Sequence, residues 1–88
     1  MHITFDVTKD AINTAKHGVT LALAADFEWH SAVTWPDVRR DYGEPRQAGL
    51  GYIGDRLFAV VFVDRAGQRR IISLRKANQR EEVIYAKA

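Results

Sequence analysis

The sequence predicts an α+β fold in which two N-terminal helices pack on an antiparallel sheet of about four to five strands and a short helix closes the chain. Three observations support this prediction. Helical periodicity is confined to the first third of the chain and to its C-terminal end. Between them, runs of strand length alternate with turn signals such as Gly54-Asp55. The chain has 88 residues and no linker, so we expect a single domain over residues 1–88.

A short strand and a first helix are expected at the N-terminus. His2 to Phe5 alternates like a strand and is followed by Asp6, a good helix N-cap. From Val7 to Lys16 the apolar positions fall on one side of a 3.6-residue period and should face the sheet. These positions are Val7, Ala11, Ile12 and Ala15. Gly18 supplies a left-handed stop for this helix.

A second helix is expected from Leu21 to about Phe27, because Thr20 can cap it. Its apolar residues should lie against the sheet; they are Leu21, Ala24, Ala25 and Phe27. At the other end of the chain, Asn78 and Glu81 have the spacing of a capping box. The chain therefore closes with a short helix.

Four further strands are expected between these helices. Pro36 places a strand over Ala32 to Trp35 at an edge, and a second strand runs from Arg46 to Ile53. The apolar run Leu57 to Val63 is typical of a central strand, and Arg69 to Lys76 returns antiparallel to it. In this last strand, simple alternation puts Ile72 and Leu74 on one face and Ile71, Ser73 and Arg75 on the other.

Composition excludes several classes of function. The chain has no cysteine, so it offers neither disulfides nor a thiolate site, and no apolar run is long enough to span a membrane. We therefore expect a cytoplasmic protein that does not bind membranes. The three histidines lack metal-ligand spacing and the acids do not cluster, so no metal or other cofactor is expected. The net charge is only +2, but arginines crowd the second two thirds of the chain and favour a polyanionic ligand.

The pair Lys16-His17 ends the first predicted helix. The negative end of the helix dipole stabilises cations there and favours a protonated imidazole, which can donate a proton. The alternative is structural: both side chains complement the dipole and His17 fixes the turn.

Arg46 and Arg75 lie at the ends of two predicted strands, and an antiparallel sheet can bring them to one side. Two guanidiniums there can clamp a phosphodiester and stabilise the charge of a phosphorane-like transition state. The alternative is an ordinary arginine at a sheet edge, paired with a surface acid.

Glu81 and Tyr85 are one helical turn apart and can approach Arg75 together as a proton relay. Glu81 has a competing role in the capping box, and Tyr85 in packing the helix. Three aromatic residues can stack unpaired bases or belong to the core instead: Trp29, Trp35 and Tyr52.

Three collinear blocks of the sequence resemble the BrnT family of toxins. The first comprises Phe5-Asp6, Lys9, Asn13 and Lys16-His17-Gly18-Val19-Thr20; the second comprises Asp41-Tyr42-Gly43-Glu44 and Arg46; the third comprises Arg70-Ile71-Ile72-Ser73, Arg75, Ala77, Glu81 and Tyr85. The segment Leu57 to Phe62 is similar to the family's central strand. The sequence departs from the family's pattern at Glu28-Trp29-His30 and at Pro45, which concerns local loop geometry.

The resemblance implies a RelE-like fold and a metal-independent endoribonuclease that inhibits translation as the toxin of a type II toxin-antitoxin system. It implies a BrnA-type antitoxin with a ribbon-helix-helix domain, through which alone the toxin would reach operator DNA. The expected catalytic residues are Arg46, Arg75, His17, Glu81 and Tyr85, and the expected RNA-binding residues are Lys16, Lys76 and Arg80. The alternative is a non-catalytic module that binds nucleic acid or protein as a co-repressor.

Overall fold

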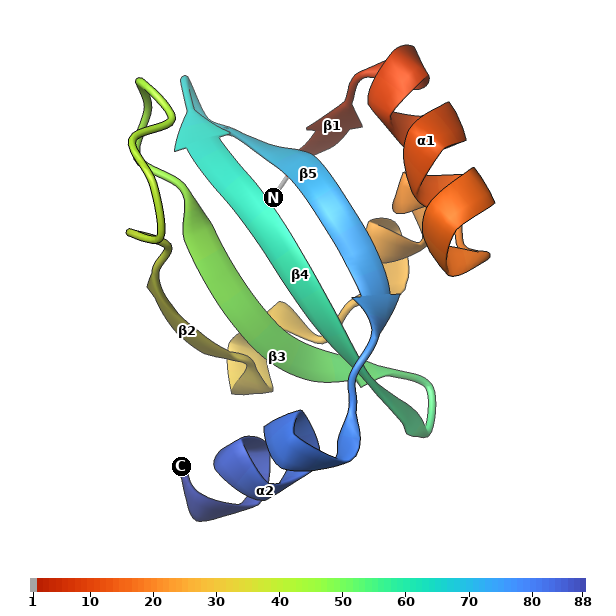
Figure 1. Ribbon diagram of the computed structural model, residues 1–88, viewed down its shortest axis with the longest axis vertical. Coiled ribbons are helices and arrows are strands. Elements are labelled where there is room, and N and C mark those ends of the chain that lie inside the picture. Colours follow the sequence, from red (N-terminus) through yellow and green to blue (C-terminus); the bar gives the residue numbers. More distant parts are fainter. Residues whose placement is uncertain (1) are drawn as a thin grey trace.

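The computed structural model describes residues 2–88, which form one five-stranded sheet with helices around it. The elements in chain order are β1 (His2–Phe5), α1 (Val7–His17), the 3-10 helices η1 (Leu21–Asp26) and η2 (Trp29–Ser31), β2 (Val33–Pro36), β3 (Gln47–Ile53), β4 (Arg56–Arg65), β5 (Gln68–Lys76) and α2 (Gln79–Lys87). Figure 1 shows α1 beside the edge formed by β1 and β5, and α2 at the end of the sheet where β5 finishes. The α+β prediction and the C-terminal helix are confirmed.

The sheet is mixed, which corrects the expectation of an antiparallel sheet. Its order is β1-β5-β4-β3-β2, with β4 central and β2 at an edge as predicted. Neighbours from β2 to β5 are antiparallel, but β1 runs parallel to β5. β5 pairs with β4 on one side only, so its other edge is free for a strand from elsewhere in the chain. β1 covers the first part of that edge, from Gln68 to Ile71.

α1 covers the rest of that edge through a polar residue, which corrects the predicted orientation of this helix. The side chain of Asn13 is buried, and its amide bonds to both backbone groups of Leu74 on β5. The predicted apolar side of the helix faces solvent, with Val7 79% and Ile12 60% exposed. Backbone groups without a hydrogen-bond partner at a buried strand edge are costly, and a side-chain carboxamide can replace the missing strand there. The helix therefore turns the side that carries Asn13 towards β5, because that side satisfies the backbone of Leu74.

The second predicted helix is a 3-10 helix, and this changes which residues it buries. Its three-residue period aligns Leu21, Ala24 and Phe27, all of which are buried, whereas Ala25 is exposed, contrary to prediction. The ring of Phe27 lies so close to Gly51 of β3 that a Cβ there would come within 2.5 Å of it. Thr20 caps this helix as expected.

A β-bulge corrects the predicted alternation of β5. Val61 pairs with Ser73, but Phe62 pairs with Ile71, so Ile72 is an extra residue. Ile71 and Leu74 consequently lie on the same face and are fully buried in one core with Leu21 and Phe62. This core fills the face of the sheet covered by η1, and we call the opposite face the open face. A smaller cluster lies on the open face, where α2 packs over Leu50 and Leu57.

Candidate functional site

The part of the open face not covered by α2 forms a groove of about 720 Å³. Its floor consists of small and apolar residues of β3 and β4: Ala48, Leu50, Ala59 and Val61. Its other polar and aromatic lining comes from five elements or loops: Lys16, His17, Trp35, Asp37, Arg39, Ser73, Arg75, Asn78, Arg80 and Glu81. Four Arg and Lys side chains face two carboxylates there, so the groove is positively charged with a neutral His17.

Arg75 is held in the groove by Glu81. Its two terminal nitrogens donate to the two carboxylate oxygens of Glu81 at 2.8 and 2.7 Å, while 38% of its side chain remains exposed. Glu81 is itself fixed by the predicted capping box, in which it accepts from the N–H of Asn78 at 2.9 Å. The hydrogen bonds from Arg75 lower the pKa of Glu81, so this carboxylate is ionised and is a poor proton donor.

His17 ends α1 at the rim of the groove, next to Gly18 in the predicted left-handed conformation. Burial lowers its pKa, and the positive charges of Lys16 and Arg75 lower it further. The expectation of a protonated imidazole is therefore wrong, because burial and the neighbouring positive charges both disfavour the charged form. A neutral imidazole can accept a proton, and both His17 and Arg75 line the groove.

Two further charged residues of the groove were not singled out from the sequence. Asp37 has only 2% of its side chain exposed and accepts two hydrogen bonds from Arg39, at 2.8 and 2.9 Å. These bonds lower the pKa of Asp37, and they fix the guanidinium of a side chain that is 74% exposed. The positive charge of Arg39 also acts on Arg75. The only signal in the sequence was the basic pair Arg39-Arg40 after the edge strand.

Trp35 is the aromatic residue that lines the groove. It lies on the edge strand β2 opposite Ala48 and is 39% exposed. The other two aromatic candidates are structural: Trp29 packs against Phe27 and Phe62, and Tyr52 packs edge-on against Tyr85. A groove with exposed guanidiniums and one exposed indole can hold a phosphate and a base side by side.

Three of the predicted site residues do not line the groove. Arg46 lies with its guanidinium 3.9 Å from the ring centroid of Tyr42 and pairs with Glu44, so only Arg75 of the predicted clamp is in the groove. The hydroxyl of Tyr85 donates to the carbonyl of Ser31 at 3.1 Å, so this side chain packs α2 against the rest of the protein. This is the structural role that stood as the alternative to proton transfer. Lys76 follows Arg75 in β5 and so points to the opposite face.

Two general features complete the description of residues 2–88. Among them, no three side chains of the metal-binding types lie together. In the same part of the chain, no helix has the length and apolar character needed to cross a membrane.

The protein is thus a small α+β protein whose groove is positively charged, contains one exposed aromatic side chain and is suited to bind a polyanion. The chain belongs to the BrnT family, the ribonuclease toxins of type II toxin-antitoxin systems, whose family model matches residues 5–81. A search of the curated proteins finds no match to this chain. A toxin of this family acts on RNA and has an antitoxin partner.

Proposed function

We propose that this toxin is an endoribonuclease that cleaves single-stranded RNA in the groove by attack of a ribose 2′-hydroxyl on the adjacent phosphorus. The attack yields a 2′,3′-cyclic phosphate and a free 5′-hydroxyl. The observation that carries the proposal is that His17 and a guanidinium fixed by Glu81, that of Arg75, line the same groove of a BrnT protein. The phosphate, the attacking hydroxyl and the leaving oxygen all belong to the substrate, so the protein supplies positioning, charge and proton transfer.

Arg75 stabilises the negative charge that develops on the phosphate oxygens. Its guanidinium is held by Glu81 before substrate arrives, so little reorganisation is needed in the transition state. Glu81 is a positioning residue in this scheme, because its lowered pKa and its two bonds to Arg75 leave it unsuited to proton transfer. Charge stabilisation by guanidiniums lets the reaction proceed without a metal ion.

His17 accepts the proton of the 2′-hydroxyl, and the departing 5′-oxygen takes up a proton from water in the open groove. Its lowered pKa keeps the imidazole neutral at physiological pH, as a general base requires. Lys16, Arg39 and Arg80 add positive charge around the groove and steer RNA towards it. Trp35 stacks on an unpaired base beside the scissile linkage, which favours single-stranded RNA.

We further propose the biological setting that the family resemblance implies. The protein acts in the cytoplasm as a single RelE-like toxin domain over residues 1–88, inhibits translation by cleaving messenger RNA, and is neutralised by a BrnA-type antitoxin. That antitoxin carries the ribbon-helix-helix domain through which the pair reaches operator DNA. The family match supports this setting because type II toxins are paired with protein antitoxins.

The test is incubation of the purified protein with RNA in the presence of a chelator, followed by mapping of the new ends. We expect 5′-hydroxyl and 2′,3′-cyclic phosphate ends, and a loss of about 100-fold in kcat/KM for Arg75→Ala. Arg56→Ala is a matched control, because this arginine bonds to the carbonyl of Ala77 and does not line the groove. Intact RNA with folded protein, or binding without cleavage, would favour the co-repressor alternative.

A further inference from the structure

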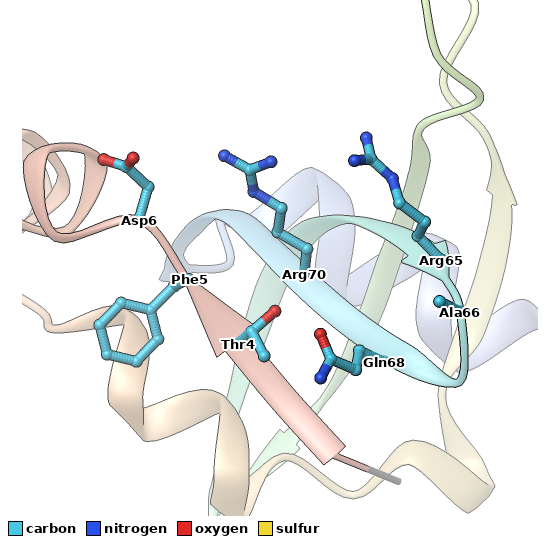
Figure 2. A pocket seen from close by; sticks show the side chains of 7 residues that line it. All are labelled: Thr4, Phe5, Asp6, Arg65, Ala66, Gln68 and Arg70. Carbon is cyan, nitrogen blue, oxygen red and sulfur yellow. The ribbon is translucent and has the colours of Figure 1, made fainter.

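A second hollow lies on the open face, at the end of the sheet opposite α2. It has a volume of about 350 Å³ and is lined by Thr4 and Asp6 and by Arg65, Gln68 and Arg70 of the β4-β5 hairpin. Figure 2 shows the side chains of Asp6, Arg70 and Arg65 rising from the same side of the sheet. Two guanidiniums, a hydroxyl and an amide thus surround one hollow, and all four groups can donate hydrogen bonds to an anion.

The adjacent residues Arg69 and Arg70 differ in what they bind. Arg69 donates to both oxygens of Asp64 at 2.7 and 2.8 Å and lies within 4.5 Å of the ring centroids of Trp29 and Phe62, on the covered face. The side chain of Arg70, by contrast, forms no hydrogen bond or ion pair with another side chain or backbone group of residues 2–88, although it is partly buried. A half-buried guanidinium whose donors have no protein partner is suited to an external anion.

The hollow and the groove lie on the same face and are joined along β5. Arg75 pairs with Ala59 and Ser73 with Val61, both in the floor of the groove. Beyond the bulge, Arg70 pairs with Val63 and with Thr4, which returns it to the open face. Arg75, Ser73 and Arg70 therefore follow one another along this face. Their partners Ala59 and Val63 are four residues apart on β4, so the two arginines are separated by about 13 Å.

We propose that the Arg70 hollow is a second phosphate site, which binds the backbone of the same RNA several nucleotides from the linkage that is cut in the groove. This inference rests on the proposed function. At a stacked rise of about 3.4 Å per nucleotide the separation corresponds to roughly four nucleotides, and to fewer in an extended strand. The RNA backbone passes over Ser73 between the two sites.

The charge of the hollow is suited to an RNA strand that the groove already binds, and not to a free anion. Arg65 is paired with Glu44 at 3.0 Å, and Asp6 adds a carboxylate, so Arg70 is the principal cation. Two guanidiniums and two carboxylates leave no net charge, so the hollow by itself is too weakly charged to hold a free phosphate dianion. The guanidinium of Arg70 can still bind a phosphodiester of a strand that the groove already holds. Binding at Arg70 consequently adds to binding in the groove and depends on RNA length.

The experiment compares wild-type protein with Arg70→Ala on oligoribonucleotides that contain one cleavage site and extend from two to ten nucleotides. We expect equal kcat/KM on the shortest substrates and a loss of about tenfold for the variant once the RNA can reach Arg70. Lys87→Ala removes one exposed positive charge at the far end of α2 and should behave as wild type. Circular dichroism checks that both variants are folded.

Binding of the same oligonucleotides with 2′-deoxy substitutions, measured by fluorescence anisotropy, tests the site without cleavage. For long oligonucleotides the slope of log K against log salt should fall by about 0.7 in Arg70→Ala. An unchanged affinity and slope for the longest RNA, or an equal loss on the shortest one, overturns the second site. Absence of cleavage by wild type, with this length-dependent binding intact, would instead count against the proposed function.

Discussion

Replacement of Asn13 by alanine is expected to lower the free energy of unfolding by about 2 to 6 kcal/mol. Asn13 is 4% exposed; its Nδ2 donates to the carbonyls of Leu74 at 2.8 Å and Val19 at 3.0 Å, and its Oδ1 accepts from the N–H of Leu74 at 3.1 Å. Alanine leaves both backbone groups of Leu74 without a partner at a buried edge, and each such group costs about 1 to 3 kcal/mol. A domain of this size is stabilised by only about 5 to 15 kcal/mol, so the effect is large.

Ile12→Ala is the matched control in the same helix. The helical pattern predicts that Ile12 belongs to the core, in which case its truncation would cost about 2 to 5 kcal/mol. In the structure Ile12 is 60% exposed, and the change should be below about 0.5 kcal/mol. Urea unfolding of the wild type and both variants, followed by far-UV circular dichroism, measures the difference. A greater loss from Ile12→Ala than from Asn13→Ala would refute the orientation of α1.

Three further predictions concern the groove. Because the pKa of His17 is lowered, the acidic limb of the pH profile of kcat/KM should have its midpoint below about pH 6.5, and this limb should be absent in His17→Asn. A midpoint above about pH 6.5 would contradict a neutral His17 acting as the base. Glu81→Gln keeps the capping box but removes the ion pair that holds Arg75. We expect kcat to fall while the free energy of unfolding at neutral pH changes by less than about 1 kcal/mol. An unchanged kcat would show that Glu81 does not position Arg75. The pKa of Glu81 in the folded protein lies below its unfolded value near 4.3, so the carboxylate stabilises the fold above that pH and this contribution is lost as the pH falls through the folded pKa. Acid unfolding curves should therefore show a smaller loss of stability on acidification for Glu81→Gln than for wild type. Trp35→Ala should raise KM about fivefold or more with kcat nearly unchanged, and Trp35→Phe should restore most of the affinity; equal KM values for all three proteins would exclude stacking.

Local chemistry explains which structural predictions are confirmed. Asp6 accepts from the N–H of Lys9, Gly18 adopts a positive φ of 73°, and Asn78 and Glu81 form a capping box. Each of these features is a hydrogen bond or a backbone conformation within a few residues, so the neighbouring sequence is enough to specify it. The edge position of β2 follows in the same way from the missing N–H of Pro36.

The candidate site is predictable only where its partners are close along the chain. Glu81 lies six residues from Arg75, and their approach is predictable from the sequence. Arg39 was not assigned to a site, because only the fold brings the loop after β2 to the side of Arg75. Arg46 is the exception: its partners Tyr42 and Glu44 are close along the chain, but they lie in an irregular segment that has no helix or strand periodicity from which the contact could be predicted.

The α+β class, the caps of the helices, the central strand and the BrnT family follow from the amino-acid sequence alone. Three features do not: the side of α1 that faces inward, the parallel placement of β1 and the bulge that turns Arg70 to the open face. All three depend on the hydrogen bonding and packing of β5 with segments far away in the chain. The local periodicity of the sequence predicts neither the unpaired edge of β5 nor its bulge residue.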